Sequence, residues 1–207
     1  MDPFGITLLK YMKGGQVRLV IERDDGFSGC IDLSIFLSDY DDWPKYEKYL
    51  LKFVKGKVLD PGRGAGRYAL WLRSRDSYVI CMDIPPYMIK VAKMKGVEGY
   101  NIGNALSPPF RDGVFHTVQL LSGNLGVSRT YESVKRLLKK IHRMSVKGSV
   151  ISASIGKFSS THRYRFKLGT LVSEWFSWVN LGRDKLRHLA RITSWEVIEF
   201  VDYGQKH

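Results

Sequence analysis

The stretch VLDPGRGAGR, residues 58–67, constrains the fold more than any other part of the chain. A short apolar run ends in Asp60, and Gly62, Gly64 and Gly66 follow at alternate positions before a helix-like segment. Glycine-rich turns between a buried strand and a helix are typical of α/β sheets that bind ligands at their carboxyl edge. Such a turn can hold a nucleotide phosphate, a dinucleotide pyrophosphate or an adenosyl group, or it can serve packing alone.

The spacing of the motif separates these alternatives. A P-loop needs Lys and then Ser or Thr after its last glycine, whereas Arg67 and Tyr68 follow Gly66 here. The dinucleotide fingerprint has its third glycine one residue later, which weakens that interpretation without eliminating it. Asp83 ends the next strand-like segment, where a carboxylate can accept two hydrogen bonds from a ribose diol. This acid therefore favours a site for a ribose-containing ligand over a turn that serves packing alone.

Strand-like and helix-like segments alternate around this motif. Because the strands are nearly continuous apolar runs, we expect a parallel sheet with helices on both faces, which is a doubly wound α/β fold. The expected strands are residues 57–60, 78–83, 97–103, 114–123 and 148–156, and the expected helices are within 41–56 and at 67–75, 86–95 and 129–145.

The two ends of the chain depart from this alternation. Residues 15–36 read as two strands around an Asp-Gly turn, so we expect an N-terminal hairpin or cap segment over 1–41. Residues 42–207 form the remainder of a single overall domain. Within it, 156–170 read as a linker, and 194–204 alternate apolar residues with acids, as in an edge strand.

Composition limits the class of protein. The 207 residues include two cysteines, and neither the cysteines nor the five histidines show a metal-ligand spacing, so no metal is expected. The N-terminus has too few consecutive apolar residues for a signal peptide, and no apolar run approaches the roughly 18 residues of a membrane span. We expect a soluble, cytoplasmic protein.

The net charge of +13 is concentrated in the last third of the chain. Residues 129–207 carry 16 Lys or Arg and 6 Asp or Glu, a net charge of +10. The helix expected at 129–145 has apolar residues at helical spacing, with basic residues around them. This surface is either a solvated helix face or a binding surface for nucleic acid or another anionic partner.

The motifs VLDPGRGAGR and VICMDIPPYMI resemble the cofactor half of the class I S-adenosylmethionine-dependent methyltransferases. LSDYDDW, SGNLG and EWFSW are similar to motifs of a small single-domain bacterial and archaeal subgroup. The resemblance covers about residues 42–204. It implies a Rossmann-like sheet of seven strands with the last strand antiparallel, S-adenosylmethionine as cofactor, and S-adenosylhomocysteine as product.

The resemblance also implies roles for particular residues. The glycines would admit the cofactor close to the backbone, Asp60 would hold the turn, and Asp83 would bind the ribose. Asn104 stands where the family often has an acid, and its amide can still bind an adenine edge. The complete expected cofactor set is Asp60, Gly62, Gly64, Gly66, Asp83, Ile84, Asn104, Ala105, Leu121 and Ser122.

The methyl acceptor is less constrained by the sequence. Ser122 or Asn124 could bind a polar acceptor atom, although turn residues of this kind are as often structural. Tyr40 and Trp43 either cover the cofactor or pack into a core. No catalytic residue is assigned.

Three functions follow from these observations. The leading one is methyl transfer to a small molecule, in which positioning supplies most of the catalysis. The alternatives are methylation of RNA or a ribosomal component through the basic surface, and a non-catalytic adenosyl-binding protein. His162 and Tyr164 are candidate bases because the linker that carries them would pass near the pocket.

Overall fold

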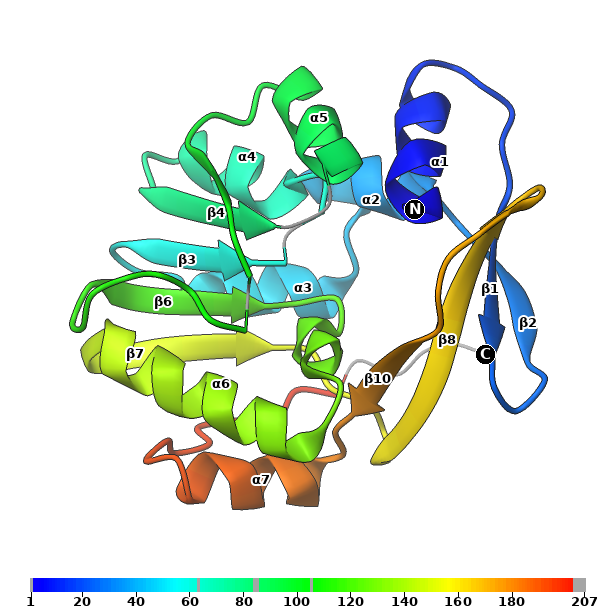
Figure 1. Ribbon diagram of the computed structural model, residues 1–207. Coiled ribbons are helices and arrows are strands. Elements are labelled where there is room, and N and C mark those ends of the chain that lie inside the picture. Colours follow the sequence, from blue (N-terminus) through cyan, green and yellow to red (C-terminus); the bar gives the residue numbers. More distant parts are fainter. Residues whose placement is uncertain (1, 63, 84–85, 105, 203–207) are drawn as a thin grey trace.

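The computed structural model describes residues 2–62, 64–83, 86–104 and 106–202. Its centre is a five-stranded parallel sheet with the order β5-β4-β3-β6-β7 (Figure 1). The strands are β3 (Val58–Pro61), β4 (Val79–Asp83), β5 (Tyr100–Ile102), β6 (Phe115–Leu120) and β7 (Ser145–Ala153). The expected strands are thus confirmed in position and in their parallel direction.

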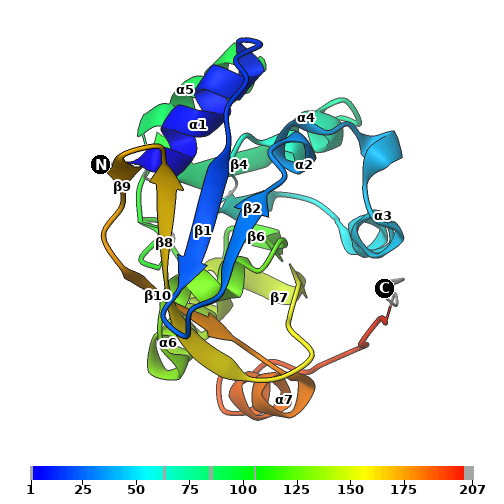
Figure 2. The same cartoon turned by 90° about the vertical axis from the view of Figure 1, so that its right-hand side faces the viewer.

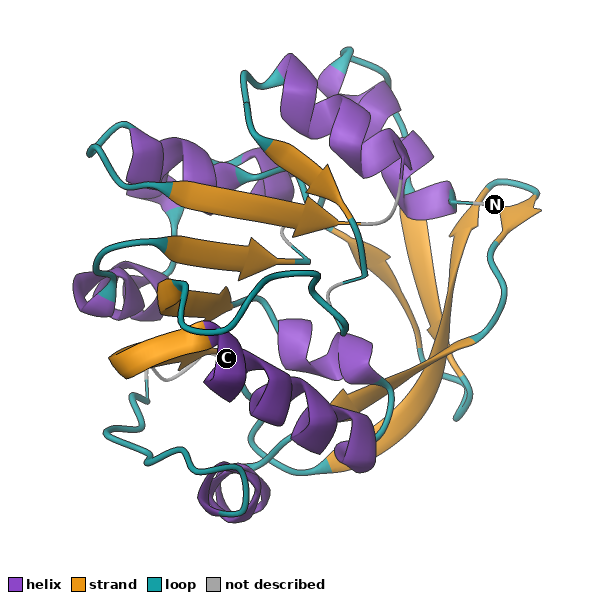
Figure 3. Ribbon diagram, turned by 60° about the vertical axis from the view of Figure 1, so that its left-hand side comes forward, coloured by secondary structure: helices purple, strands orange, loops and turns teal. Residues whose placement is uncertain are grey.

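Helices cover both faces of this sheet (Figure 3). Val58 belongs to a hydrophobic cluster with residues of α4, whereas Leu59 belongs to a second cluster with residues of α6 and α7. Successive side chains of a strand point to opposite faces, so β3 is buried on both sides. The helices are α3 (Lys45–Leu50), η2 (Leu51–Phe53), α4 (Arg67–Arg73), α5 (Pro86–Met94), α6 (Tyr131–Met144) and α7 (Arg183–Arg191).

Helix α6 confirms the amphipathic pattern of the sequence. The Thr130 side chain caps the helix by accepting a hydrogen bond from Ser133 N at 3.1 Å. The apolar residues at helical spacing are buried, and the basic residues around them lie at the surface or half-buried; the buried set is Val134, Leu137, Leu138, Ile141 and Met144.

A second, antiparallel sheet stands across the carboxyl ends of the parallel strands (Figure 1) and faces the viewer in Figure 2. Its order is β10-β8-β1-β2, and β9 pairs with β8. The strands are β1 (Leu19–Arg23), β2 (Ser28–Ile31), β8 (Ser160–Leu168), β9 (Leu171–Val172) and β10 (Phe176–Asn180). Helix α1 (Pro3–Met12) lies against α5 and β8.

This second sheet corrects two expectations. The expected linker contains β8, which pairs with β1 and β10. In the first four residues of β8, half-buried and exposed side chains alternate. Glu22 of β1 forms ion pairs with Arg165 at 2.6 Å and with Lys167 at 3.0 Å. The expected hairpin forms, but its second strand ends at Ile31, and the short α2 (Ser34–Leu37) and η1 (Tyr40–Asp42) follow it.

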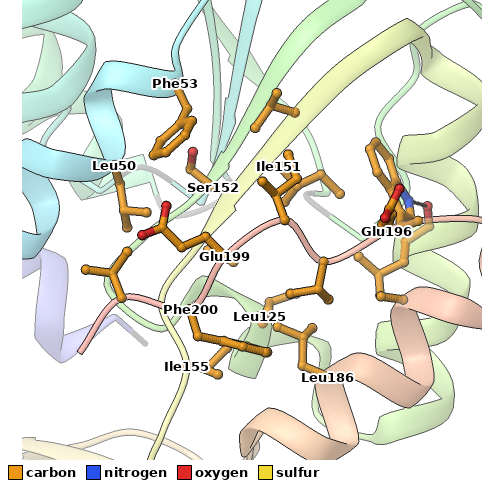
Figure 4. A pocket seen from close by; sticks show the side chains of 18 of the residues that line it. Leu50, Phe53, Leu125, Ile151, Ser152, Ile155, Leu186, Glu196, Glu199 and Phe200 are labelled. Carbon is orange, nitrogen blue, oxygen red and sulfur yellow. Dashed lines mark hydrogen bonds between the residues drawn. The ribbon is translucent and has the colours of Figure 1, made fainter.

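The expectation of one seven-stranded sheet is also wrong, because the chain has a five-stranded parallel sheet and a separate antiparallel one. No strand is assigned to the described part of 194–204. Residues 195–201 instead run along the β7 side of the sheet, across a mainly apolar cavity of about 160 Å³ lined by Leu50, Phe53 and Ile151 (Figure 4). Trp195, Val197 and Phe200 are half-buried where they line this cavity, whereas Ile198 is 74% exposed, so the segment is held by partial burial and not by strand pairing. No helix within the described ranges is long and apolar enough to cross a membrane.

Candidate active site

Four strand ends bring the expected residues to one edge of the parallel sheet. Asp60 lies in β3 and is only 2% exposed, Asp83 ends β4, and Ser122 follows β6. Asn104 follows β5, where the backbone N–H of Gly103 donates to Asp83 O at 3.2 Å. Because these strands are parallel neighbours, residues far apart in the sequence meet where the order of connections reverses.

The glycine-rich turn is directly tied to the neighbouring strand. Gly62 N donates to Met82 O at 2.8 Å, and Gly64 N donates to Asp83 Oδ2 at 2.9 Å. Gly64 has a φ of 59°, a backbone region in which a side chain is strained, and a Cβ there would lie 3.1 Å from Met88 Cε. At Gly64 the turn therefore keeps this course only without a side chain.

Asn124 supports the turn from the other side. Its Nδ2 donates to Gly62 O at 2.9 Å and to Pro61 O at 3.2 Å. Asn124 belongs to the short helix η3 (Asn124–Ser128), which follows β6. Of the two alternatives for Asn124, the structure supports the structural one, because its amide donates to backbone carbonyls of the turn.

The side chains of the remaining expected cofactor residues do not all face the same site. Leu121 is buried in the core cluster with Trp43 and Tyr68, so its side chain does not face an open site. The Asn104 side chain accepts a hydrogen bond from Leu106 N at 2.9 Å, which orders its own turn. Ile84 and Ala105 lie outside the residues that the structure describes.

An ion pair that sequence reasoning missed lies beneath this edge. Arg67 Nη2 lies 2.9 Å from both carboxylate oxygens of Glu47, and both side chains are largely buried, at 12% and 3% exposure. The guanidinium lies 5.2 Å from the ring centre of Trp43 and 4.5 Å from that of Tyr68. The available signal was an arginine directly after the last glycine, together with the single acid of the helix KYEKYL.

Arg67 connects this pair to Ser122. Its Nη2 donates to the Tyr68 hydroxyl at 2.7 Å and to Ser122 Oγ at 3.4 Å, and the two hydroxyls are 3.2 Å apart. Burial raises the pKa of Tyr68 far above its usual value, so this phenol stays protonated. Ser122 has a φ of 55° and donates its backbone N–H to Ser154 Oγ at 3.1 Å. Strained non-glycine residues of this kind are concentrated at functional sites.

Tyr46 extends the same network. Its hydroxyl donates to Glu47 Oε1 at 3.2 Å. Burial, followed by the negative charge of Glu47, raises the pKa of Tyr46 to about 12. A cavity of about 200 Å³ adjoins Ser122, and Tyr46 contributes to its wall. The other walls come from η3, the segment after β7, and β10 with the residue after it.

Other residues considered from the sequence lie away from this cavity. Tyr40 stacks on Trp71 with ring centres 4.6 Å apart, and Trp43 is 4% exposed, so both pack into a core. His162 and Tyr164 lie on β8, and His162 Nδ1 is 3.6 Å from Asp24 Oδ1. Neither residue lines the cavity beside Ser122. Within the described residues, no group of three or more His, Cys, Asp or Glu could hold a metal ion.

Comparison with known proteins agrees with this fold. Residues 59–153 match the family model described as a methyltransferase domain. A SAM-dependent methyltransferase from Bacteroides fragilis, crystallised with S-adenosyl-L-homocysteine, has a TM-score of 0.85 at 20% identity, covering 99% of this chain and 90% of that one. No curated protein matches the sequence significantly.

Two further solved structures share the core of the fold. A SAM-dependent methyltransferase from Methanosarcina mazei has a TM-score of 0.56 at 16% identity, covering 70% of this chain and 82% of that one. The sugar N-methyltransferase KedS8 from Streptoalloteichus has a TM-score of 0.52 at 16% identity, covering 81% and 86%. At these identities the likeness concerns the fold. The methyltransferase domain matched over residues 59–153 and the shared fold together support a class I S-adenosylmethionine-dependent methyltransferase, which is an enzyme.

Proposed function

We propose that the enzyme binds S-adenosylmethionine at the glycine-rich edge of the parallel sheet and transfers its methyl group to a small molecule. The observation that carries this proposal is the hydrogen bond between Gly64 N and Asp83 Oδ2. It brings a glycine-rich turn and a strand-end carboxylate into one site. S-adenosylmethionine needs both, because its ribose binds a carboxylate and its other parts approach the backbone closely.

The residues present fit this cofactor. A Cβ at Gly64 would lie 3.1 Å from Met88 Cε, so close approach of the cofactor to this part of the backbone depends on glycine. In the proposed site, Asp60 and the glycines at 62, 64 and 66 shape the turn. Asp83 holds the ribose, and Ile84 covers the adenine. Asn104 and Ala105 contact the adenine edge, and Leu121 and Ser122 lie beside the reacting methyl, with Leu121 contributing through its backbone.

The cofactor supplies an activated methyl group on a sulfonium, so the protein's task is to position the acceptor in line and exclude water. Positioning of two reactants can supply roughly 7–11 kcal/mol of the barrier. Residues 42–207 would carry this activity, with the segment 1–41 as its cap.

Two observations favour a small acceptor. The cavity beside Ser122 has a volume of about 200 Å³, which suits one small molecule or a single group of a larger one. The structural neighbour KedS8 is a sugar N-methyltransferase. The alternative acceptors, RNA or a ribosomal component, would use the basic surface of α6 and α7.

Calorimetry with S-adenosylhomocysteine tests the cofactor site. We expect saturable one-to-one binding that Asp83→Ala weakens, and absence of binding to the wild-type protein would refute the proposal. Incubation with methyl-labelled S-adenosylmethionine and a fractionated cell extract tests the acceptor. Label is expected in the small-molecule fraction; transfer only to RNA, accompanied by salt-sensitive RNA binding, would instead support the alternative.

A further inference from the structure

The cavity beside Ser122 has the size of a single-ring molecule. It is partly open to solvent and has a volume of about 200 Å³, whereas an engineered enclosed cavity of about 150 Å³ already takes up benzene. Leu125, Ile155, Val179 and Leu181 supply apolar wall. A ring with an apolar face would bury that face here with a favourable hydrophobic contribution.

The walls of the cavity are uncharged. Its described lining residues include no Asp, Glu, Lys, Arg or His, and their polar side chains are those of Tyr46, Ser122, Ser154 and Asn180. A charged ligand moved from water into such a site would lose its hydration without gaining an opposite charge. The cavity therefore favours an uncharged occupant with polar groups on one edge.

A chain of polar contacts connects the Tyr46 hydroxyl to Ser122. Arg67 Nη2 contacts Glu47 Oε1 at 2.9 Å and Ser122 Oγ at 3.4 Å, and the Tyr46 hydroxyl contacts the same Glu47 oxygen at 3.2 Å. Tyr46 and Ser122, which both line the cavity, are thus joined through one guanidinium nitrogen and one carboxylate oxygen.

The direction of the Tyr46 hydrogen bond determines what the phenol can offer to the cavity. A carboxylate only accepts hydrogen bonds, so the single proton of the Tyr46 hydroxyl is donated to Glu47. The phenolic oxygen can then only accept a hydrogen bond from a molecule in the cavity. An acceptor with an O–H or N–H group satisfies this oxygen, and its methylated form without that proton does not.

We propose, as an extension of the proposed function, that this cavity binds the methyl acceptor as an uncharged single-ring molecule with a hydroxyl or amine, which Tyr46 orients and deprotonates. As the bond between the cofactor sulfur and its methyl breaks and the acceptor–methyl bond forms, the acceptor proton moves to Tyr46 Oη. The original Tyr46 proton moves to Glu47 Oε1. The products are a neutral thioether, the methylated acceptor and a protonated Glu47, which later releases its proton to water.

Phenol and anisole test the binding part of this proposal, because they share a ring and differ by the O–H proton. Ligand-observed NMR titrations would use protein saturated with S-adenosylhomocysteine. We expect phenol to bind at least about tenfold more tightly than anisole, a difference of about 1.4 kcal/mol. Tyr46→Phe should reduce that ratio to near one. Binding of 4-hydroxybenzoate should be at least about tenfold weaker than that of phenol, since its carboxylate stays charged.

Tyr49→Phe is the matched control. Tyr49 lies on the same helix α3, but its hydroxyl bonds to Glu199 at 3.0 Å and it does not line this cavity. It should leave the phenol-to-anisole ratio unchanged. Equal binding of phenol and anisole by the wild type, preference for the carboxylated probe, or a ratio that survives Tyr46→Phe would each overturn the proposal.

The proton-transfer part has its own readout once a labelled product identifies an acceptor. Tyr46→Phe should lower kcat by about a hundredfold, within the range typical of general-base catalysis, and leave S-adenosylhomocysteine affinity unchanged. An unchanged kcat would refute the transfer through Tyr46. Failure of S-adenosylhomocysteine to bind the wild type would instead refute the proposed function, so the two failures are distinguishable.

Discussion

Arg67, the first residue of α4, and Glu47, in α3, form an ion pair at 2.9 Å with both side chains largely buried. This pair joins the helix that follows the glycine-rich turn to the helix that carries Tyr46. A buried ion pair stabilises a protein little more than a pair of apolar residues of similar size would. Removal of one partner alone is strongly destabilising, because the other charge is left buried and uncompensated.

Glu47→Ala should therefore lower the free energy of unfolding by about 3–5 kcal/mol. The double variant Glu47→Leu with Arg67→Met should be less destabilised than the single variant Glu47→Leu, because it removes both charges together. Urea denaturation of the variants measures this. Additive effects of the two substitutions would show that the pair is not coupled.

Asp83→Ala should weaken S-adenosylhomocysteine binding by about 1.5–3 kcal/mol, because hydrogen bonds to a charged group are lost. Calorimetry measures the affinity. Thermal unfolding checks that the variant, which loses the hydrogen bond from Gly64 N to the Asp83 side chain, stays folded. Asp184→Ala is the control, since its side chain is fully exposed on α7. An Asp83→Ala protein that folds and binds with wild-type affinity would remove Asp83 from the site.

A comparison of Gly64→Ala with Gly169→Ala separates the effect of backbone strain from the effect of blocking close approach of the cofactor. Their φ angles are 59° and 58°, but a Cβ at Gly169 meets nothing within 4 Å, whereas one at Gly64 lies 3.1 Å from Met88 Cε. Both substitutions should cost about 1–2 kcal/mol of stability from the left-handed backbone. Only Gly64→Ala should also weaken S-adenosylhomocysteine binding. Equal affinity in both variants would argue against close approach of the cofactor to this backbone.

Gly126→Ala should disrupt the contact between η3 and strand β10 of the antiparallel sheet. A Cβ at Gly126 would overlap the indole of Trp178 in β10, so the ring or the η3 turn must move. We expect a loss of about 1–3 kcal/mol, typical of overpacking. Trp178→Leu should recover part of that loss in the double variant, as measured by denaturation. If Trp178→Leu leaves the cost of Gly126→Ala unchanged, the contact is not the cause.

Tyr46 should make stability depend on pH in the alkaline range. Its pKa is about 12 in the folded protein, against an ordinary value of 10.0 for a solvated phenol; burial and Glu47 raise it, and Arg67 opposes the rise. The folded state retains the proton where the unfolded state loses it. This contribution to stability is therefore complete below pH 10 and is lost as the pH rises from 10 towards 12.

The difference in unfolding free energy between wild type and Tyr46→Phe should consequently shrink as the pH rises through this range. Chemical denaturation of both proteins at several alkaline pH values measures the difference, and other groups cancel to first order. Tyr49→Phe serves again as the control. A difference that stays constant with pH would mean that the Tyr46 phenol titrates alike in both states.

The parallel sheet could be predicted because its information is local. Near-continuous apolar strands, the glycine spacing after Asp60 and the helical periodicity of residues 129–145 each depend on neighbours in the sequence. Parallel strands end at a common edge, so the meeting of Asp60, Asp83 and Ser122 followed from that topology. Their roles with the cofactor remain a proposal.

The sequence by itself determined the α/β class, the glycine-rich turn and the edge of the sheet where a ligand would bind, because strand and helix periodicity are properties of short segments. Only the tertiary structure decided that residues 160–168 pair with the N-terminal hairpin, that residues 195–201 form no strand, and that Glu47 meets Arg67. These outcomes depend on contacts between residues about 20 to 145 positions apart. The burial and strand-pairing energies of the whole chain decide these contacts, because no local sequence pattern specifies which distant segment a strand or side chain will meet.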